Sequence, residues 1–310
     1  MSGKRYFVLL FLLWANTSAV LALDIMGPPS AGVKKGKLSL GVDYSHSRTG
    51  VKLNQGSGSW KGFNNGVLSL SDSGRISSQS IKNLKLNKVF ANIAYGVTDD
   101  WDVFLLLGGA NADFNYKDGP QRLFGITPPI LSSSMLFPTG QKADGDNSFA
   151  IGFGTKVTFC KHEKLKWGGL FQLSHFSDSD GKRSGTYDSG QGIMTVTGSS
   201  QWSHYVDIEI TEIQIAFGPS YELTENILIY GGPFFHIVDG RVDGKYSESG
   251  QLGVTAVDYL TEYSYDIDER SIFGGYIGLQ VKNAGNISFN IEYQHTAFAD
   301  GLGINLLWAF

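Results

Sequence analysis

The last nine residues of the chain, 302–310, constrain its fold more than any other segment, because they alternate and end on an aromatic residue. Successive side chains of a β-strand point to opposite faces, so every second residue here contributes to one apolar face. A strand that is apolar on one face and small or polar on the other is typical of the last strand of a membrane β-barrel. The residues of this face are Leu302, Ile304, Leu306, Trp308 and Phe310.

The start of the chain predicts export from the cytoplasm. Lys4 and Arg5 precede an apolar run to Trp14, and a polar break leads to Val20-Leu21-Ala22, a pattern typical of a signal peptide cleaved after residue 22. The run is too short for a spanning helix, which needs about 20 apolar residues. We therefore expect a signal peptide at 1–22, a short periplasmic segment at 23–35 and a membrane barrel at 36–310.

Composition agrees with a membrane barrel and argues against nucleic-acid binding. The chain holds 40 Gly, 20 Phe, 14 Tyr and 6 Trp. Its mean hydropathy is near zero, at −0.09, as expected when lipid-facing and lumen-facing residues alternate. Without Lys4 and Arg5, the 25 basic residues fall to 23 against 29 acidic ones. Since nucleic-acid binding depends on an excess of positive charge, no nucleic-acid partner is expected.

Alternation with a period of two recurs along the chain and predicts about ten strands, within a range of 8–12. Tight turns at 98–100, 161–164, 222–226 and 283–285 alternate with long polar segments. Membrane barrels in which short and long connections alternate have short periplasmic turns and long extracellular loops. The predicted fold class is therefore all-β, a closed antiparallel up-and-down transmembrane β-barrel.

One predicted strand, ending at Tyr221, changes the face on which its apolar residues lie. Ile208 and Ile210 share one parity, whereas Ile213 and Ile215 share the other. The change near Thr211 predicts either a β-bulge or the point at which the strand leaves the bilayer.

Three pieces of the chain carry a resemblance to a known superfamily: 95–104, 221–227 and 286–292. They resemble strand-turn-strand pieces of the small bacterial outer-membrane β-barrels, which include opacity proteins, the membrane domain of the OmpA family and porin-like barrels. The resemblance covers most of 36–310. It implies an outer-membrane location, contact with outer-membrane lipid, and biogenesis through periplasmic chaperones and the barrel assembly machinery. Residues 302–310 also resemble the C-terminal assembly signal of these proteins.

The inward faces of the predicted strands define a candidate lumen. Eight strands are filled by their own side chains and an aqueous channel opens only at about sixteen, so ten strands predict a narrow, mostly plugged interior. A mutually hydrogen-bonded polar network is favoured there over an open solute path. The inward candidates are Asp43, Lys88, Asn92, Asp102, Lys156, Gln172, Gln214, Gln280, Glu292, Gln294 and Asn305.

These features predict a structural or passive porin-like role in the outer membrane. The alternative is surface adhesion or ligand binding, for an unknown external ligand, through the polar loops at 56–60, 71–74 and 178–181. Acidic residues between 258 and 269 offer carboxylates to a divalent cation, but without the spacing of an EF-hand loop. No cofactor or metal is therefore expected.

A third hypothesis is an outer-membrane enzyme of the omptin or lipid-hydrolase kind, which places His, Asp and Ser at the outer rim. His175 lies near Asp178 and Asp180 in the sequence, and His204 lies near Asp207. General-base catalysis needs a His that a carboxylate orients towards a nucleophile or a water. The spacing secures no such arrangement, so we assign no catalytic residue and expect no enzymatic activity.

Overall fold

The computed structural model describes residues 23–76, 79–115, 142–144, 147–187, 199–252, 254–283 and 286–310. Strands dominate this part of the chain, and no helix within it is long and apolar enough to cross a membrane.

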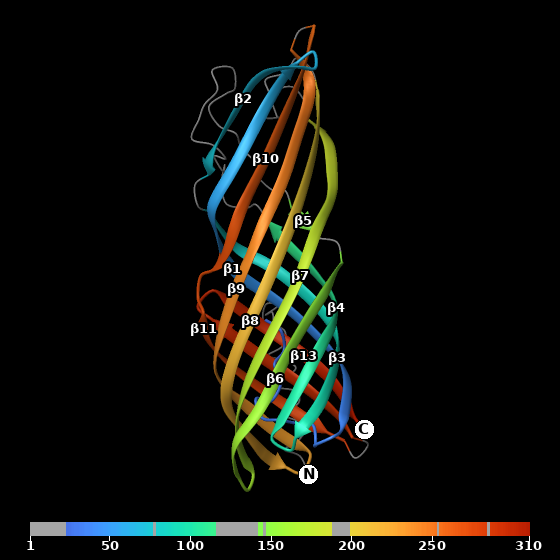
Figure 1. The fold of residues 1–310 in the computed structure, drawn as a ribbon, viewed down its shortest axis with the longest axis vertical. Coiled ribbons are helices and arrows are strands. Elements are labelled where there is room, and N and C mark those ends of the chain that lie inside the picture. Colours follow the sequence, from blue (N-terminus) through green and yellow to red (C-terminus); the bar gives the residue numbers. More distant parts are fainter. Residues whose placement is uncertain are drawn as a thin grey trace, which may run out of the picture.

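Ten strands pair antiparallel, each with its neighbour, and the first pairs with the last, so the sheet closes into a barrel (Figure 1). Closure satisfies every strand edge, which a bilayer requires because lipid offers no hydrogen bonds. The predicted fold class and strand number are confirmed. In ring order the strands are β1 (Leu38–Asn64), β3 (Gln79–Thr98), β4 (Trp101–Asn115), β6 (Ser148–His162), β7 (Leu165–Tyr187), β8 (Ser200–Thr224), β9 (Ile227–Leu252), β11 (Phe273–Lys282), β12 (Ile287–Thr296) and β13 (Ala299–Ala309).

A belt of exposed apolar side chains surrounds the lower half of the barrel. Large hydrophobic residues on the outer face of all ten ring strands are exposed here, whereas a water-soluble fold would bury them. Polar residues alternate with them and face the interior, as in a barrel embedded in lipid. The belt includes Leu40, Val42, Val89, Ile93, Leu105, Ile151, Phe153, Trp167, Ile215, Phe217, Ile229, Phe235, Ile277, Phe289, Ile304 and Leu306.

Much of what the sequence predicts as extracellular loops is strand instead. β1 continues to Asn64 and pairs with β2 (Val67–Ile76), and β10 (Thr255–Glu269) pairs with both β9 and the upper part of β1. A further short strand, β5 (Lys142–Asp144), extends the edge of β4. In Figure 1, β2 and β10 lie towards the end of the barrel opposite the N and C labels. The prediction of long flexible loops is therefore wrong at 56–60, 71–74 and 178–180, because paired strands outside the bilayer lack the apolar outer face that identifies strands within it.

The change of parity in β8 marks the exit from the bilayer. The pairing of β7 with β8 runs without interruption through Thr211, so there is no bulge at that position. Ile208 and Ile210 are buried in the interior, whereas Ile215 and Phe217 are exposed on the outer face. The apolar face of the strand thus turns inward, where the sheet leaves lipid and packs against its own interior.

Candidate functional site

Residues 23–35, which the sequence predicts as a short periplasmic segment, lie inside the barrel and at its lower mouth. Leu23, Asp24, Met26 and Ser30 are at most 4% exposed. Residues 31–35 become progressively more exposed and lead to the start of β1. We call residues 23–35 the plug segment. Signal-peptide cleavage after residue 22 stays a prediction, because residues 1–22 lie outside the described part of the chain.

Two carboxylates of the barrel wall hold the main chain of the plug segment. Glu292 on β12 accepts hydrogen bonds from the amides of Met26 and Gly27, at 3.0 and 2.9 Å. Asp102 on β4 accepts from the amides of residues 32 and 33, at 2.7 and 3.2 Å. A carboxylate bonded by successive amides is a charge-assisted contact, stronger than a neutral hydrogen bond. The segment is therefore held by a few discrete polar bonds.

A chain of buried charges runs from the plug segment across the lumen. Asp24 pairs with Lys88 at 2.9 Å, and Lys88 pairs with Glu212 at 2.8 Å. The imidazole of His236 lies 3.2 Å from Glu212 and 2.9 Å from Glu269, one carboxylate at each ring nitrogen. Two carboxylate acceptors suit an imidazolium, which has two N–H donors. Isolated buried charges are costly, so each of these groups depends on its neighbours.

Glycines line the wall where the plug segment comes closest. A Cβ on Gly168 would lie 2.5 Å from the carbonyl oxygen of Pro29 and 2.5 Å from the Cα of Ser30. A Cβ on Gly96 would lie 2.2 Å from the carbonyl oxygen of Lys34. Real Cβ atoms do not approach other atoms this closely. The absence of side chains at these wall positions therefore makes room for the main chain of the plug segment.

The eleven predicted lumen residues all lie inward, nine of them at most 8% exposed and the other two, Asn92 and Lys156, partly buried. Hydrogen bonds join several of them: the amide of Asn92 donates to Asp43 at 2.8 Å, and Gln214 donates to Gln294 at 3.2 Å. Asn305 also donates to Asp43. The remaining members of the predicted set are Lys88, Asp102, Lys156, Gln172, Gln280 and Glu292.

The charged interior residues that sequence reasoning missed include Asp24, Glu212, His236 and Glu269. Glu212 stands two residues before Gln214 and so shares its inward face, a signal that the period of two contains. Asp24 carries no such signal, because the plug segment has no strand periodicity.

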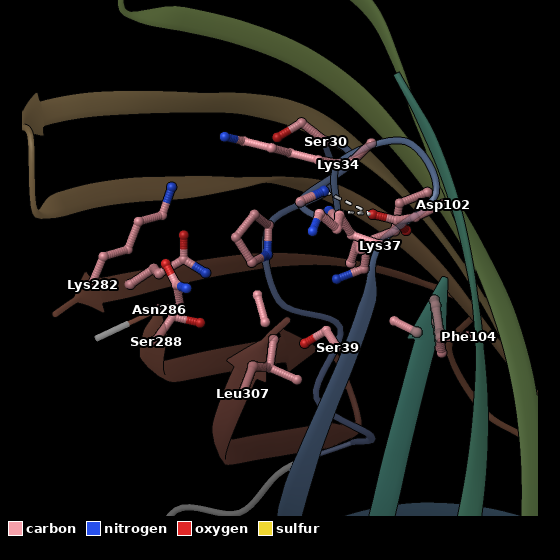
Figure 2. Close-up of a pocket in the computed structure, with 18 of the residues that line it drawn as sticks. Ser30, Lys34, Lys37, Ser39, Asp102, Phe104, Lys282, Asn286, Ser288 and Leu307 are labelled. Atoms are coloured by element: carbon pink, nitrogen blue, oxygen red, sulfur yellow. Dashed lines mark hydrogen bonds between the residues drawn. The ribbon is translucent and has the colours of Figure 1, made fainter. Parts of the chain in front are cut away.

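At the periplasmic end, the plug segment and the wall enclose a cavity of about 440 Å³. Figure 2 shows the side chains of Lys34, Lys37 and Lys282 around it, with Asp102 bonded to the plug main chain on its far side. Lys156 and Lys166 also line it. The cavity is therefore predominantly cationic.

The residues predicted as an assembly signal lie on the outer face of β13. Leu302, Ile304, Leu306, Trp308 and Phe310 are each 39–53% exposed and complete the apolar belt. Their placement is that of lipid-facing residues; their role in assembly stays a prediction.

No protein-family model matches the chain, and no curated protein matches it. Several solved structures are similar to it. The outer-membrane protease OmpT from Escherichia coli is 10% identical over 90% of this chain and 99% of its own, with a TM-score of 0.36. The outer-membrane protein OprG from Pseudomonas aeruginosa is 12% identical over 79% and 97%, with a TM-score of 0.25. Ail, the attachment invasion locus protein of Yersinia pestis, is 12% identical over 89% and 99%, with a TM-score of 0.22.

These scores are too low to support any conclusion about function, so the classification rests on the closed ten-strand ring and its apolar belt. The chain is a membrane-spanning β-barrel protein. Its belt faces the lipid of a bilayer, and the location in the bacterial outer membrane stays a prediction. The involvement of periplasmic chaperones and the assembly machinery stays a prediction.

Of the two histidines weighed as catalytic candidates, His204 does not pair with Asp207. The side chains of Asp178 and Asp180, predicted near His175, lie outside the described part of the structure. His204 is buried in the interior and contacts the hydroxyl of Tyr263 at 2.9 Å, whereas Asp207 accepts a hydrogen bond from Tyr205 on the outer side. Residues three apart on a strand face opposite sides, which separates the two groups. His175 contacts Thr211 at 3.0 Å.

The acidic residues of 258–269 do not converge on a cation site either. They are distributed along β10, where Glu262 pairs with Lys245 at 3.0 Å and Asp268 accepts a hydrogen bond from Asn54 at 2.5 Å. Within the described residues, no group of three or more His, Cys, Asp or Glu side chains is arranged to hold a metal ion.

Proposed function

We propose that this protein is a narrow outer-membrane channel for small hydrophilic solutes, and that the plug segment keeps it closed. The observation that carries the proposal is the position of residues 23–30 within the lumen, where Glu292 on β12 accepts hydrogen bonds from their main chain. Asp102 on β4 holds the adjoining residues 32 and 33 in the same way.

The polar and ionic side chains of the lumen wall favour a plug segment that can leave the lumen over one that fills it permanently. Amides and carboxylates such as Gln172, Gln214 and Asn290 lie in the interior at membrane level, among buried aromatic and aliphatic side chains. A polar wall can exchange its hydrogen bonds to the plug for hydrogen bonds to water, at a net cost of about 1 kcal/mol each. A barrel that is always filled has no need of buried ionic groups, because apolar residues of similar volume often stabilise as well or better.

The size of the ring limits what can pass. Ten strands lie between the filled eight-strand barrel and the sixteen-strand aqueous pore, so an unplugged lumen would admit only small solutes. Movement through it is expected to be passive and to follow the concentration gradient.

A reversible tether tests the proposal. The side-chain oxygens of Ser30 on the plug segment and Ser220 on β8 lie 3.1 Å apart, so Ser30→Cys with Ser220→Cys offers a disulfide between plug and wall. Cys160, which lies exposed on the barrel, is replaced by Ala to prevent mispairing. Single-channel conductance is then recorded in planar bilayers under oxidising and reducing conditions.

Openings that occur only after reduction would support a plug-gated channel. Equal openings in both conditions would show that ions pass without plug movement, and silence in both would contradict the channel altogether. The matched control is the single Ser220→Cys variant, whose conductance should not respond to the reductant.

A further inference from the structure

We propose that the cationic cavity at the periplasmic mouth is a binding site for a small oxyanion of the phosphate type. This deepens the proposed function by naming a solute class, and it depends on the plug segment for one wall of the cavity.

The lysines of the cavity come from separate parts of the chain. Lys34 belongs to the plug segment, Lys37 precedes β1, Lys156 lies on β6, Lys166 on β7 and Lys282 at the end of β11. Convergence from five segments places five ammonium-bearing side chains around one space of about 440 Å³. Like charges so close together raise the local potential and attract a counter-ion.

Few of these lysines have a carboxylate in ion-pair contact. Asp102, Glu292 and Asp43 attract Lys156 from nearby without pairing with it. Lys166 pairs with Glu222 at 3.0 Å, outside the lining of the cavity. Asp102 is directed to the plug amides of residues 32 and 33. Within the described residues, Lys34, Lys37, Lys156 and Lys282 make no ion pair; the pairs observed elsewhere in the barrel involve other lysines.

The position of Lys156 and the neutral polar side chains of the cavity lining favour an oxyanion over chloride as the ligand. Lys156 lies deepest, beneath the plug at Gly27 and 5.7 Å from the ring centre of Phe104, where it is partly shielded from water. Neutral hydrogen-bonding side chains, including those of Gln280, Asn286 and Ser288, complete the lining. Lysine is a point charge on a flexible stem, and several of them can close on separate oxygens of one anion. The volume is within the range of small-molecule sites, about 300–1,000 Å³.

The same phosphate chemistry is present in a free solute and in the headgroups of the inner leaflet beside the mouth. Binding is therefore measured with inorganic phosphate by calorimetry, at low ionic strength, first on the full mature chain in nonionic detergent. The measurement is repeated in nanodiscs of phosphatidylglycerol. Loss of phosphate affinity in these nanodiscs would assign the site to lipid headgroups; unchanged affinity would assign it to a soluble anion.

The decisive comparison uses two double variants of equal charge. Lys34→Gln with Lys282→Gln removes two cavity lysines, whereas Lys161→Gln with Lys164→Gln removes two exposed lysines of the β6–β7 turn. We expect one saturable phosphate site in the unmodified protein, weakened about tenfold or more by the first pair and unchanged by the second, because charge-assisted contacts act at short range.

Absence of saturable binding, or equal loss in both double variants, would overturn the proposal. Repeating the titration on the oxidised Ser30→Cys, Ser220→Cys protein separates this result from the channel proposal. Phosphate binding to the locked barrel does not require the channel to open. The absence of channel openings would therefore refute only the channel proposal, and the absence of phosphate binding would refute only the anion site.

Discussion

A single methyl group on the inner wall should open the barrel. In the Gly168→Ala variant the new Cβ would lie 2.5 Å from both the carbonyl oxygen of Pro29 and the Cα of Ser30, and 2.6 Å from the amide nitrogen of Ser30. All three are main-chain atoms, so no flexible side chain can move aside. Either the plug segment or β7 has to shift by about half an ångström or more to restore ordinary contact distances.

The plug segment should yield first, because discrete polar bonds hold it, whereas β7 is paired on both sides by β6 and β8. Overpacking of this kind costs typically about 1–3 kcal/mol. If that cost falls on the closed state alone, the ratio of open to closed barrels rises about 5- to 150-fold. Single-channel open probability in planar bilayers measures this ratio directly.

The neighbouring residue provides the control. Gly169 faces the other side of β7, and a Cβ there would have 3.8 Å to its nearest atom, an ordinary contact. Gly169→Ala should therefore leave the open probability unchanged. If Gly168→Ala remains folded, as judged by heat-modifiable gel migration, and opens no more often than Gly169→Ala, the close approach of plug and wall does not hold the barrel shut.

Three further variants test the contact of Asp24 with Lys88, the lipid-facing belt and the predicted assembly signal. Asp24→Asn removes the negative charge from the contact with Lys88 and should raise open probability about 30- to 150-fold, from about 2–3 kcal/mol of lost charged hydrogen bonding, whereas Asp100→Asn in a periplasmic turn should not. Ile304→Arg on the lipid face should destabilise the refolded barrel by about 2–4 kcal/mol in denaturant titrations in lipid vesicles; an unchanged midpoint would contradict the placement of the belt. Phe310→Lys should reduce insertion into the outer membrane without reducing export, measured by cell fractionation; normal insertion would contradict the assembly-signal prediction.

The membrane-level strands were predictable because lipid imposes a strict alternation. On β13, Ile304 and Leu306 need lipid on one face while Asn305 needs a polar interior on the other, and no other secondary structure meets both demands. The tight turns between these strands followed from the same pattern, since each falls where the alternation stops.

The outer strands and the plug segment could not be predicted in the same way. Above the bilayer the outer face meets water, so charged residues such as Asp243 and Lys245 replace the apolar signal and resemble a loop. The plug segment has Pro28, Pro29 and several glycines, a composition typical of a linker. Its partners, such as Glu292 for Met26, are 266 positions away in the chain, and a single sequence contains no record of that proximity.

One edge of β1 pairs with two different strands, one in the membrane-level part of the barrel and the other above it. Within the membrane belt, β1 closes the ring through β13, from Ser39↔Ala309 to Thr49↔Ala299; above it, from Val51↔Glu269 to Asn64↔Val257, β10 takes over that side. On β9, likewise, β11 gives way to β10. The hairpin of β9 and β10 thus stands where three membrane strands end, which narrows the structure above the belt in Figure 1.

The two closures cannot form independently, because both need β1 in register. A slip of β1 by one residue would reverse its faces at both levels at once, placing Asp43 towards lipid and Val51 towards water. The register of β1 therefore sets both the membrane ring and the outer wall of this chain.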